Sequence, residues 1–235
     1  MYSTRDTHIR SNTMNILLIG AQGSGKGTQA EFLSQVLHIL PISSGDLFRQ
    51  AFTEKTELGL KAKAFVDRGE LVPDDLTVSM VLQHIQGLDY TQNFLLDGFP
   101  RTVTQAQALD QGLQGIGRQL DLVIYLQVPR EELLFRLAGR FLCQAQQHIY
   151  NIRSCPPKVT GICDIDGSTL FQRSDDTGAA IETRLDIFFN ETIYLLDFYQ
   201  KQDKLIEVNG NQDIEQVHPV LLNQIYSSMQ QQRAS

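Results

Sequence analysis

The sequence predicts an α/β fold with a doubly wound parallel sheet, and two observations carry this prediction. Residues 15–19 form a short apolar run that ends directly before a glycine, which is typical of a strand buried on both faces of a parallel sheet. Further strand-like runs at 93–96, 122–128 and 204–208 are separated by segments rich in helix-forming residues. Such alternation of strands and helices favours a parallel sheet covered by helices.

Three other segments are distinctive. Residues 43–72 read as a helical insertion, and residues 139–176 contain prolines, glycines and short runs that indicate a small turn-rich insertion. From 181 to 199 apolar residues recur at steps of four and three, which predicts one long amphipathic helix. We therefore expect a single domain over 14–235 that carries both insertions, and a flexible extension at 1–13.

Composition limits the classes of function. Of the 235 residues, 42% are hydrophobic and 20% are charged, as in ordinary globular proteins. The net charge of −7 argues against sequence-independent binding to nucleic acid or to an anionic membrane, because both need a positive surface field. No apolar run approaches the ~20 residues of a membrane span, and the N-terminal stretch lacks the apolar centre of a secretory signal. We expect a cytoplasmic monomer.

A glycine-rich segment follows the first predicted strand and precedes a predicted helix at 28–37. It reads Gly20-Ala-Gln-Gly-Ser-Gly-Lys26. Glycines let several backbone N–H groups converge on one anion, the helix adds its positive end, and Lys26 adds a charge. A glycine-rich turn without a ligand is the alternative, which the flanking strand and helix disfavour. Gly27 stands where Ser or Thr usually follows the lysine of such loops, and Thr28 comes one place later.

Several blocks of sequence resemble the adenylate kinase family. Residues 20–29 resemble its phosphate-binding loop (P-loop) and residues 95–102 resemble its second signature, while 44–49, 139–140 and 172–176 match further blocks in the same order. The resemblance covers about 14–208 and is closest to the long-lid form common in bacteria. It implies a P-loop kinase in which 43–72 binds the nucleoside monophosphate (NMP) and 139–176 is the lid. It also implies Mg²⁺-dependent, direct in-line transfer of a phosphoryl group from ATP to AMP, giving two ADP.

The resemblance also implies which side chains act. The catalytic cations would be Lys26, Arg49, Arg101, Arg140, Arg173 and Arg184. Arg101 has independent support, because it follows a buried strand at the edge of the sheet where open α/β folds place ligands. Asp46 and Asp97 would hold Mg²⁺ through water, since this ion keeps much of its hydration shell. No general base is needed, because the acceptor oxygen of a phosphate is already anionic.

Two sets of substrate-binding residues follow from the same resemblance. Those for AMP are Ser44, Arg49, Glu70, Leu71, Val72, Gly98, Phe99, Pro100, Arg101, Gln105, Arg173 and Arg184. Those for ATP are Gly23, Ser24, Gly25, Lys26, Gly27, Thr28, Arg136, Arg140, Ile149, Tyr150 and Gln212. The Gln105 amide offers both a donor and an acceptor to an adenine edge. Arg136 either stacks on the donor base or is an ordinary exposed helix residue.

The lid raises the question of a structural metal. Many long-lid relatives bind zinc through four cysteines, or three and an aspartate, and the corresponding places here are Cys143, Gln146, Cys163 and Asp166. Glutamine is a poor zinc ligand, Cys155 lies where the family has no ligand, and His148 would reach the site only by rearrangement. We therefore expect a lid closed by hydrogen bonds and packing, with structural Zn²⁺ as the less favoured alternative.

Three rival functions remain open from the sequence. One is a kinase for other nucleotides, with GTP as donor or UMP or CMP as acceptor; the long insertion and Gln105 favour AMP. Another is a nucleotide-binding switch without kinase turnover. The absence of an Asn-Lys-x-Asp segment, which reads guanine in such switches, argues against it. The third is a noncatalytic relative, which we would expect to have lost Lys26 or Arg101; both are retained.

Overall fold

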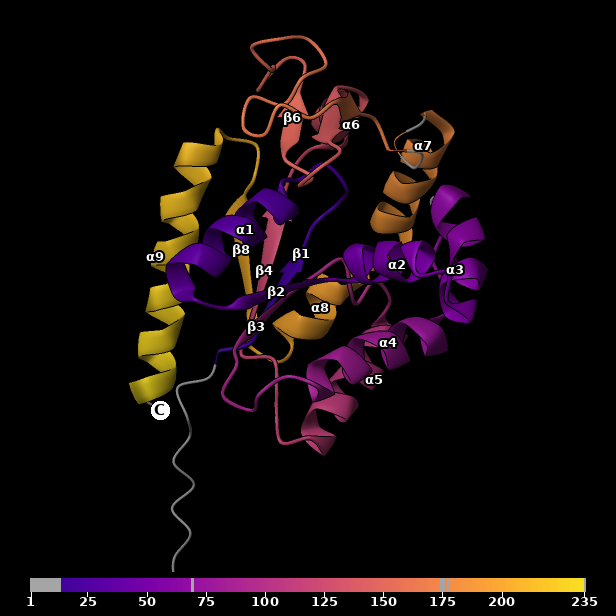
Figure 1. Ribbon diagram of the computed structural model, residues 1–235. Coiled ribbons are helices and arrows are strands. Elements are labelled where there is room, and N and C mark those ends of the chain that lie inside the picture. Colours follow the sequence, from indigo (N-terminus) through magenta and orange to yellow (C-terminus); the bar gives the residue numbers. More distant parts are fainter. Residues whose placement is uncertain (1–13, 69, 174–175, 177, 235) are drawn as a thin grey trace, which may run out of the picture.

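The computed structural model describes residues 14–68, 70–173, 176 and 178–234, so the prediction for 1–13 lies outside the described residues. At its centre is a five-stranded parallel sheet in the order β2-β3-β1-β4-β8 (Figure 1). The strands are β1 (Ile16–Ile19), β2 (Leu40–Ser43), β3 (Phe94–Asp97), β4 (Leu122–Gln127) and β8 (Leu205–Asn209). The chain builds the sheet outward in both directions from β1, which confirms the predicted α/β fold.

Strand β1 supplies both sides of the interior. Its four residues are all buried, and it pairs with β3 and β4 on either side. Ile16 and Leu18 belong to the apolar cluster beneath α1 (Lys26–Leu37) and α9 (Ile214–Ala234). Leu17 and Ile19 belong to the opposite cluster, to which α4 (Asp74–Gln86), α5 (Val103–Gly115) and α6 (Arg130–Ala138) contribute. Alternate residues of a strand point to opposite faces, so one apolar run serves two helix layers.

The sequence did not predict β2. It lies at the edge of the sheet, contains Pro41, and pairs only with β3. Proline cannot donate to a strand ladder and is tolerated at sheet edges. Only Ile42 of its four residues is buried, and Pro41 interrupts the apolar stretch that begins at Ile39, so the strand lacks the pattern of the central strands.

The predicted helix at 181–199 forms with an interruption. It consists of α7 (Gly178–Ile187), a π-helical turn (Phe188–Thr192) and α8 (Tyr194–Gln200). The residues of its predicted apolar face are all buried: Ile181, Leu185, Phe188, Thr192, Leu195 and Tyr199. The periodicity therefore identified the correct face, although it gave no sign of the wider turn.

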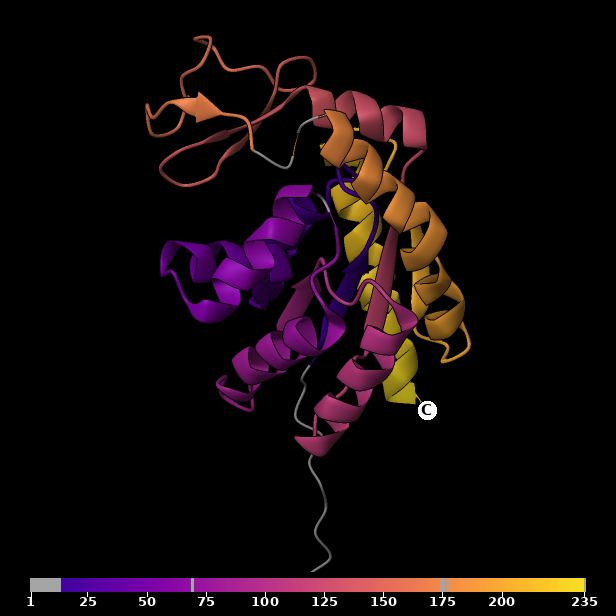
Figure 2. The same cartoon turned by 90° about the vertical axis from the view of Figure 1, so that its right-hand side faces the viewer.

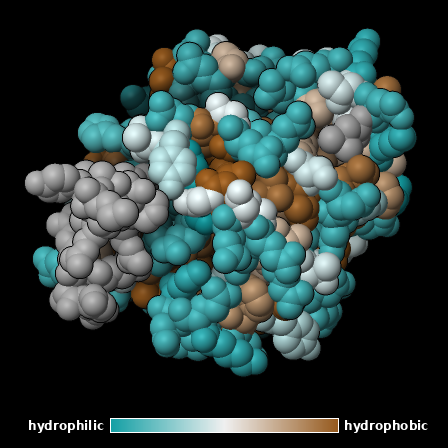
Figure 3. Space-filling view, turned by 90° about the horizontal axis from the view of Figure 1, so that it is seen from below, coloured by the Kyte–Doolittle hydropathy of each residue, from teal (hydrophilic) through white to brown (hydrophobic). Residues whose placement is uncertain are grey.

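The two insertions extend from the core on the same side. The first contains α2 (Ser44–Thr53) and α3 (Glu57–Arg68); the second contains an antiparallel sheet of β5 (Arg140–Cys143), β6 (Ile149–Asn151) and β7 (Leu170–Phe171). Figure 2 shows the lid strands above α2 and α3. The opposite end of the molecule is mostly hydrophilic, with apolar side chains gathered near its centre (Figure 3). Among the described residues, no helix is long and apolar enough to cross a bilayer.

Candidate active site

A cleft of about 1510 Å³ is lined by the glycine-rich loop, both insertions and the segment 210–217. All the predicted catalytic, ATP, AMP and Mg²⁺ residues line it except Phe99 and Pro100. Phe99 is 1% exposed and packs in the core, while Pro100 lines a smaller neighbouring cavity. The topology therefore brings residues that are far apart in sequence to one place at the carboxyl ends of the strands, where open α/β sheets bind ligands.

The glycine-rich loop needs its glycines. Gly23 and Gly25 have φ of +83° and +94°, a region that other residues rarely adopt. A Cβ atom on Gly23 would also lie 3.0 Å from Cγ of Leu137 on α6. The loop leads into α1, which begins at Lys26, so the positive end of the helix faces the cleft. The Ser24 hydroxyl is buried here without a hydrogen-bond partner among the described residues.

Lys26 is buried and turned back onto the loop. Its Nζ donates to the carbonyl oxygens of Gly20 at 2.7 Å and Ala21 at 3.0 Å. Burial lowers the pKa of Lys26 to about 8; nearby Asp97 acts in the opposite direction, and Arg101 and other arginines lower the pKa further. Burial therefore makes the charged form of Lys26 costly, and an anion bound beside the ammonium group would favour that charged form.

Two of the predicted arginines share one buried carboxylate. Asp176 accepts a hydrogen bond from Nε of Arg140 at 2.8 Å, and its Oδ1 lies 3.5 Å from Nη1 of Arg184 on α7. Its side chain is fully buried. The sequence indicated the block 172–176, yet only Arg173 received a role from it. Asp176 was therefore missed, although a carboxylate within an arginine-rich block is a signal that could have revealed it.

The carbonyl oxygen of Gly98, just beyond β3, joins two further predicted residues. It accepts hydrogen bonds from Oγ of Ser44 at 2.9 Å and from Nε of Arg101 at 2.8 Å. Gly98 has φ of +79°, and a Cβ atom there would lie 3.0 Å from the Ser44 hydroxyl. This contact ties the start of α2 to the end of the sheet. On the same helix Asp46 pairs with Arg49, whose Nε lies 3.1 Å from Oδ1.

The residues predicted to contact the donor base differ in how far their side chains face the cleft. Arg136 donates to Glu132 at 2.7 Å and to the carbonyl of Gly210 at 3.2 Å, which sets it beside the loop that contains Gln212. Ile149 is exposed at the cleft. The hydroxyl of Tyr150 instead points into the lid, 3.4 Å from Sγ of Cys163, so only part of its ring is available to the cleft.

Comparison with known proteins identifies the family. The family model described as adenylate kinase matches residues 18–204, about four fifths of the chain. The chain belongs to the adenylate kinase family. An adenylate kinase of Carboxydothermus hydrogenoformans is 46% identical over 210 residues, covering 89% of this chain and 98% of the relative. One from Staphylococcus aureus strain Mu50 is 47% identical over 204 residues, covering 87% and 95%. One from Thermosipho africanus is 44% identical over 210 residues, covering 89% and 98%.

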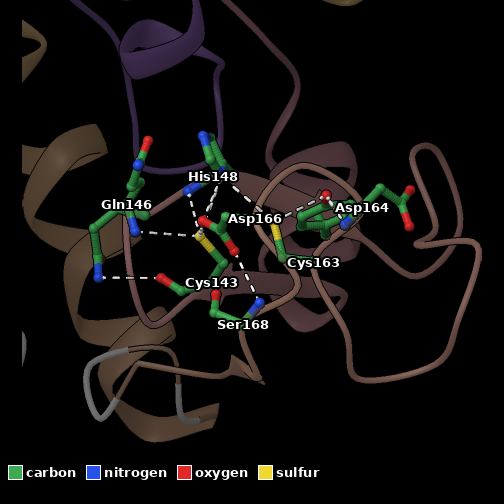
Figure 4. A network of polar contacts seen from close by, with 9 residues as sticks. Cys143, Gln146, His148, Cys163, Asp164, Asp166 and Ser168 are labelled. Atoms are coloured by element: carbon green, nitrogen blue, oxygen red, sulfur yellow. Dashed lines mark hydrogen bonds and ion pairs between the residues drawn. The ribbon is translucent and has the colours of Figure 1, made fainter.

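In this adenylate kinase family member the lid contains a four-residue cluster of metal-binding groups (Figure 4). One ligand atom from each of Cys143, His148, Cys163 and Asp166 lies within 4.8 Å of the others. Nδ1 of His148 is 3.3 Å and 3.4 Å from the two sulfur atoms and 3.2 Å from Oδ2 of Asp166. Thiolate, imidazole and carboxylate in a group of four are a donor set that suits Zn²⁺.

The expectation that His148 would reach this group only by rearrangement was wrong. Gln146 contributes its backbone N–H to Sγ of Cys143 at 3.4 Å, and its side chain is not one of the four groups. His148 occupies the place without rearrangement. The reason is a tight turn in which Gln147 has φ of +62°, so that the N–H of His148 returns to Cys143 at 3.2 Å. Cys155 is exposed and outside the cluster, as predicted.

Proposed function

We propose that this chain transfers the terminal phosphoryl group of ATP to AMP and thereby forms two molecules of ADP. The observation that carries the proposal is the single cleft lined both by the glycine-rich loop and by a second set of arginines near Gly98 and Ser44. A protein that binds one nucleotide has no use for the second set. Membership of the adenylate kinase family and the names of the relatives support the same substrates.

Phosphoryl transfer requires alignment and charge neutralisation more than covalent help. An anionic oxygen of AMP attacks the γ-phosphorus of ATP, the bond from that phosphorus to the β,γ-bridging oxygen breaks, and its electrons leave with ADP. Arg49 and Arg101 would bind the acceptor phosphate. Arg140, Arg173 and Arg184 would surround the transferring group, and Lys26 would exchange its carbonyl partners for phosphate oxygens.

Mg²⁺ is part of this proposal. The carboxylates of Asp46 and Asp97 both line the cleft and would hold the ion through water, as Mg²⁺ prefers oxygen ligands and retains water. When bound with ATP, the ion neutralises phosphate charge. The residues of this chain would then position the two phosphates and exclude water from the transfer.

We further propose that the four-residue cluster in the lid holds structural Zn²⁺, which would tie the turn after β5 to the segment 163–166. The four donor groups within 4.8 Å support this site. Elemental analysis of protein purified without chelator should find one zinc per chain. The variant His148→Ala should lose most of the metal, whereas Cys155→Ala should retain it. Absence of zinc from the unaltered protein would overturn this part of the proposal.

One experiment separates the main proposal from its rivals. The protein is mixed with Mg²⁺ and ATP or GTP, together with AMP, UMP, CMP or no acceptor, and diphosphate formation is measured beside loss of triphosphate. We expect rapid turnover only for the pair of ATP as donor and AMP as acceptor. Turnover with another pair would favour a different nucleoside monophosphate kinase, and hydrolysis without acceptor would favour a switch. Absence of any turnover would favour a noncatalytic relative.

The functional unit is proposed to be a monomer in the cytoplasm that uses only small nucleotides as partners. In support, one chain contains both phosphate-binding groups in a single cleft. Sedimentation or light scattering at working concentration should give a mass near 26.5 kDa.

A further inference from the structure

The side-chain amide of Gln105 has its orientation fixed by two neighbours. The residue is 2% exposed yet lines the cleft. Its Oε1 accepts from the backbone N–H of Arg101 at 2.7 Å, and its Nε2 donates to Oδ1 of Asp74 at 2.6 Å. A backbone N–H only donates and a carboxylate only accepts. Rotating the amide by half a turn would therefore put two donors together and two acceptors together, which costs both hydrogen bonds.

Asp74 is itself held in place. It begins α4, and its second oxygen accepts from the hydroxyl of Thr102 at 3.1 Å. That hydroxyl also accepts the backbone N–H of Gln105 at 3.1 Å, where Thr102 caps α5. Asp74 therefore bridges two helices and reaches Gln105 in a defined direction. It does not line the cleft.

The chemistry that remains on the amide is directional. An amide has two N–H donors and two acceptor lone pairs, and the two contacts use one of each. One donor and one acceptor remain for a base. A 6-aminopurine presents an N–H donor at position 6 and an acceptor at N1, whereas a 6-oxopurine presents the reverse pair. An amide that can turn freely would complement the donor and acceptor pattern of either base. An amide with a fixed orientation complements the pattern of only one.

We propose that Asp74 is a positioning residue that makes the acceptor site selective for a 6-aminopurine monophosphate over its 6-oxo analogue. It acts by fixing the orientation of the Gln105 amide, and it does not contact the base. This inference rests on the proposed function, because it takes AMP as the acceptor and Gln105 as a residue that contacts its base.

The test compares AMP with inosine monophosphate as acceptor for ATP. In Asp74→Asn the new side chain can donate or accept, so it accommodates either orientation of the Gln105 amide, and only the backbone N–H of Arg101 still opposes turning. The ratio of kcat/KM for AMP to that for inosine monophosphate should fall about tenfold or more, mainly through KM. The matched control is Asp75→Asn, which removes the same charge from the same first turn of α4 at an exposed side chain. Its ratio should equal that of the unaltered protein.

The outcomes are distinguishable. If the unaltered protein does not use AMP, the proposed function fails. If it uses AMP and Asp74→Asn leaves the ratio unchanged, this inference is overturned. An equal decline in activity toward both acceptors, together with lower stability, would show that Asp74 has a purely structural role. If Asp74→Asn does not fold, nuclear magnetic resonance of the unaltered protein decides: the Gln105 side-chain NH₂ should exchange slowly with solvent, and rapid exchange would contradict a fixed amide.

Discussion

Asp176 accepts a 2.8 Å hydrogen bond from Arg140, so the first strand of the lid is joined to the chain just before α7. The carboxylate is completely buried, and Arg184 approaches it from α7. Two guanidinium groups are thus oriented by one counter-charge. A buried charge left without its partner is strongly destabilising, so this relationship can be tested by removing the charge while keeping the shape.

We expect Asp176→Asn to lower kcat at least about tenfold and to lower the free energy of unfolding by about 1–3 kcal/mol. The reason is that both arginines lose the anion that orients them. Steady-state kinetics and thermal unfolding measure the two effects. Asp186→Asn is the control, because Asp186 pairs with Arg130 at an exposed position and should change stability by less than about 1 kcal/mol. Equal effects from both variants would contradict the role of Asp176.

Nucleotide binding should take up protons in alkaline solution. The lowered pKa of Lys26, about 8, means that near and above pH 8 much of the lysine is neutral in the unliganded protein. Phosphate favours the charged form and raises this pKa, so binding draws a proton from solvent. Well below pH 8 the lysine is already charged and takes up none. Titration calorimetry of ATP binding in buffers of different ionisation enthalpy measures the uptake.

The control for proton uptake is Lys26→Arg, whose side chain is always charged. The difference between the two proteins at each pH removes the contribution of the nucleotide's own ionisation. This difference should grow from near zero at pH 6 as pH rises through 8. A difference that is constant with pH would show that Lys26 is not the titrating group.

Arg101→Lys should leave the fold intact and lower kcat by about 10³-fold. A lysine provides a point charge but cannot hold the carbonyl of Gly98 and a phosphate with one planar group. Turnover and thermal unfolding are compared with those of Arg153→Lys, an arginine that lies over the ring of Phe135. The control should keep normal turnover, and near-normal turnover in Arg101→Lys would refute its proposed role.

Gly98→Ala should destabilise the protein by about 1–2 kcal/mol, because φ of +79° is costly for any residue with a Cβ atom. The new methyl group would also press on the Ser44 hydroxyl, so we expect a higher KM for AMP. Gly115→Ala is the matched control, since nothing lies within 4 Å of a Cβ atom there and its φ is not positive. Equal melting temperatures for the two variants would argue against the strain.

The sequence predicted the parts of the fold that depend on local pattern. The strand-like runs of β1, β3, β4 and β8 and the apolar face of 181–199 are such patterns, and all of them form. The edge strand β2 was not recognised, because Pro41 interrupts its apolar residues and only Ile42 of the strand is buried. The π-helical turn depends on packing within the core, which has no local signature.

The candidate site divides in the same way. The glycine-rich loop was predicted from local residue types, and family resemblance added the arginines and the substrate residues. The partnership of His148 with Cys143 depends on the turn geometry at Gln147, and that of Asp74 with Gln105 joins the start of α4 to α5. Contacts of this kind depend on the exact geometry of the folded backbone. They cannot be predicted from the residue pattern of a single sequence.

The central position of β1 affects how the protein unfolds. Its alternate side chains enter both apolar clusters, so neither helix layer can separate from the sheet without disturbing the strand that the other layer also covers. Partial opening of one half is therefore unfavourable near the centre, and the backbone amides of Leu17 and Leu18 should exchange with deuterium only when the whole molecule unfolds. We therefore expect the motions that admit and release nucleotides to be confined to the two insertions.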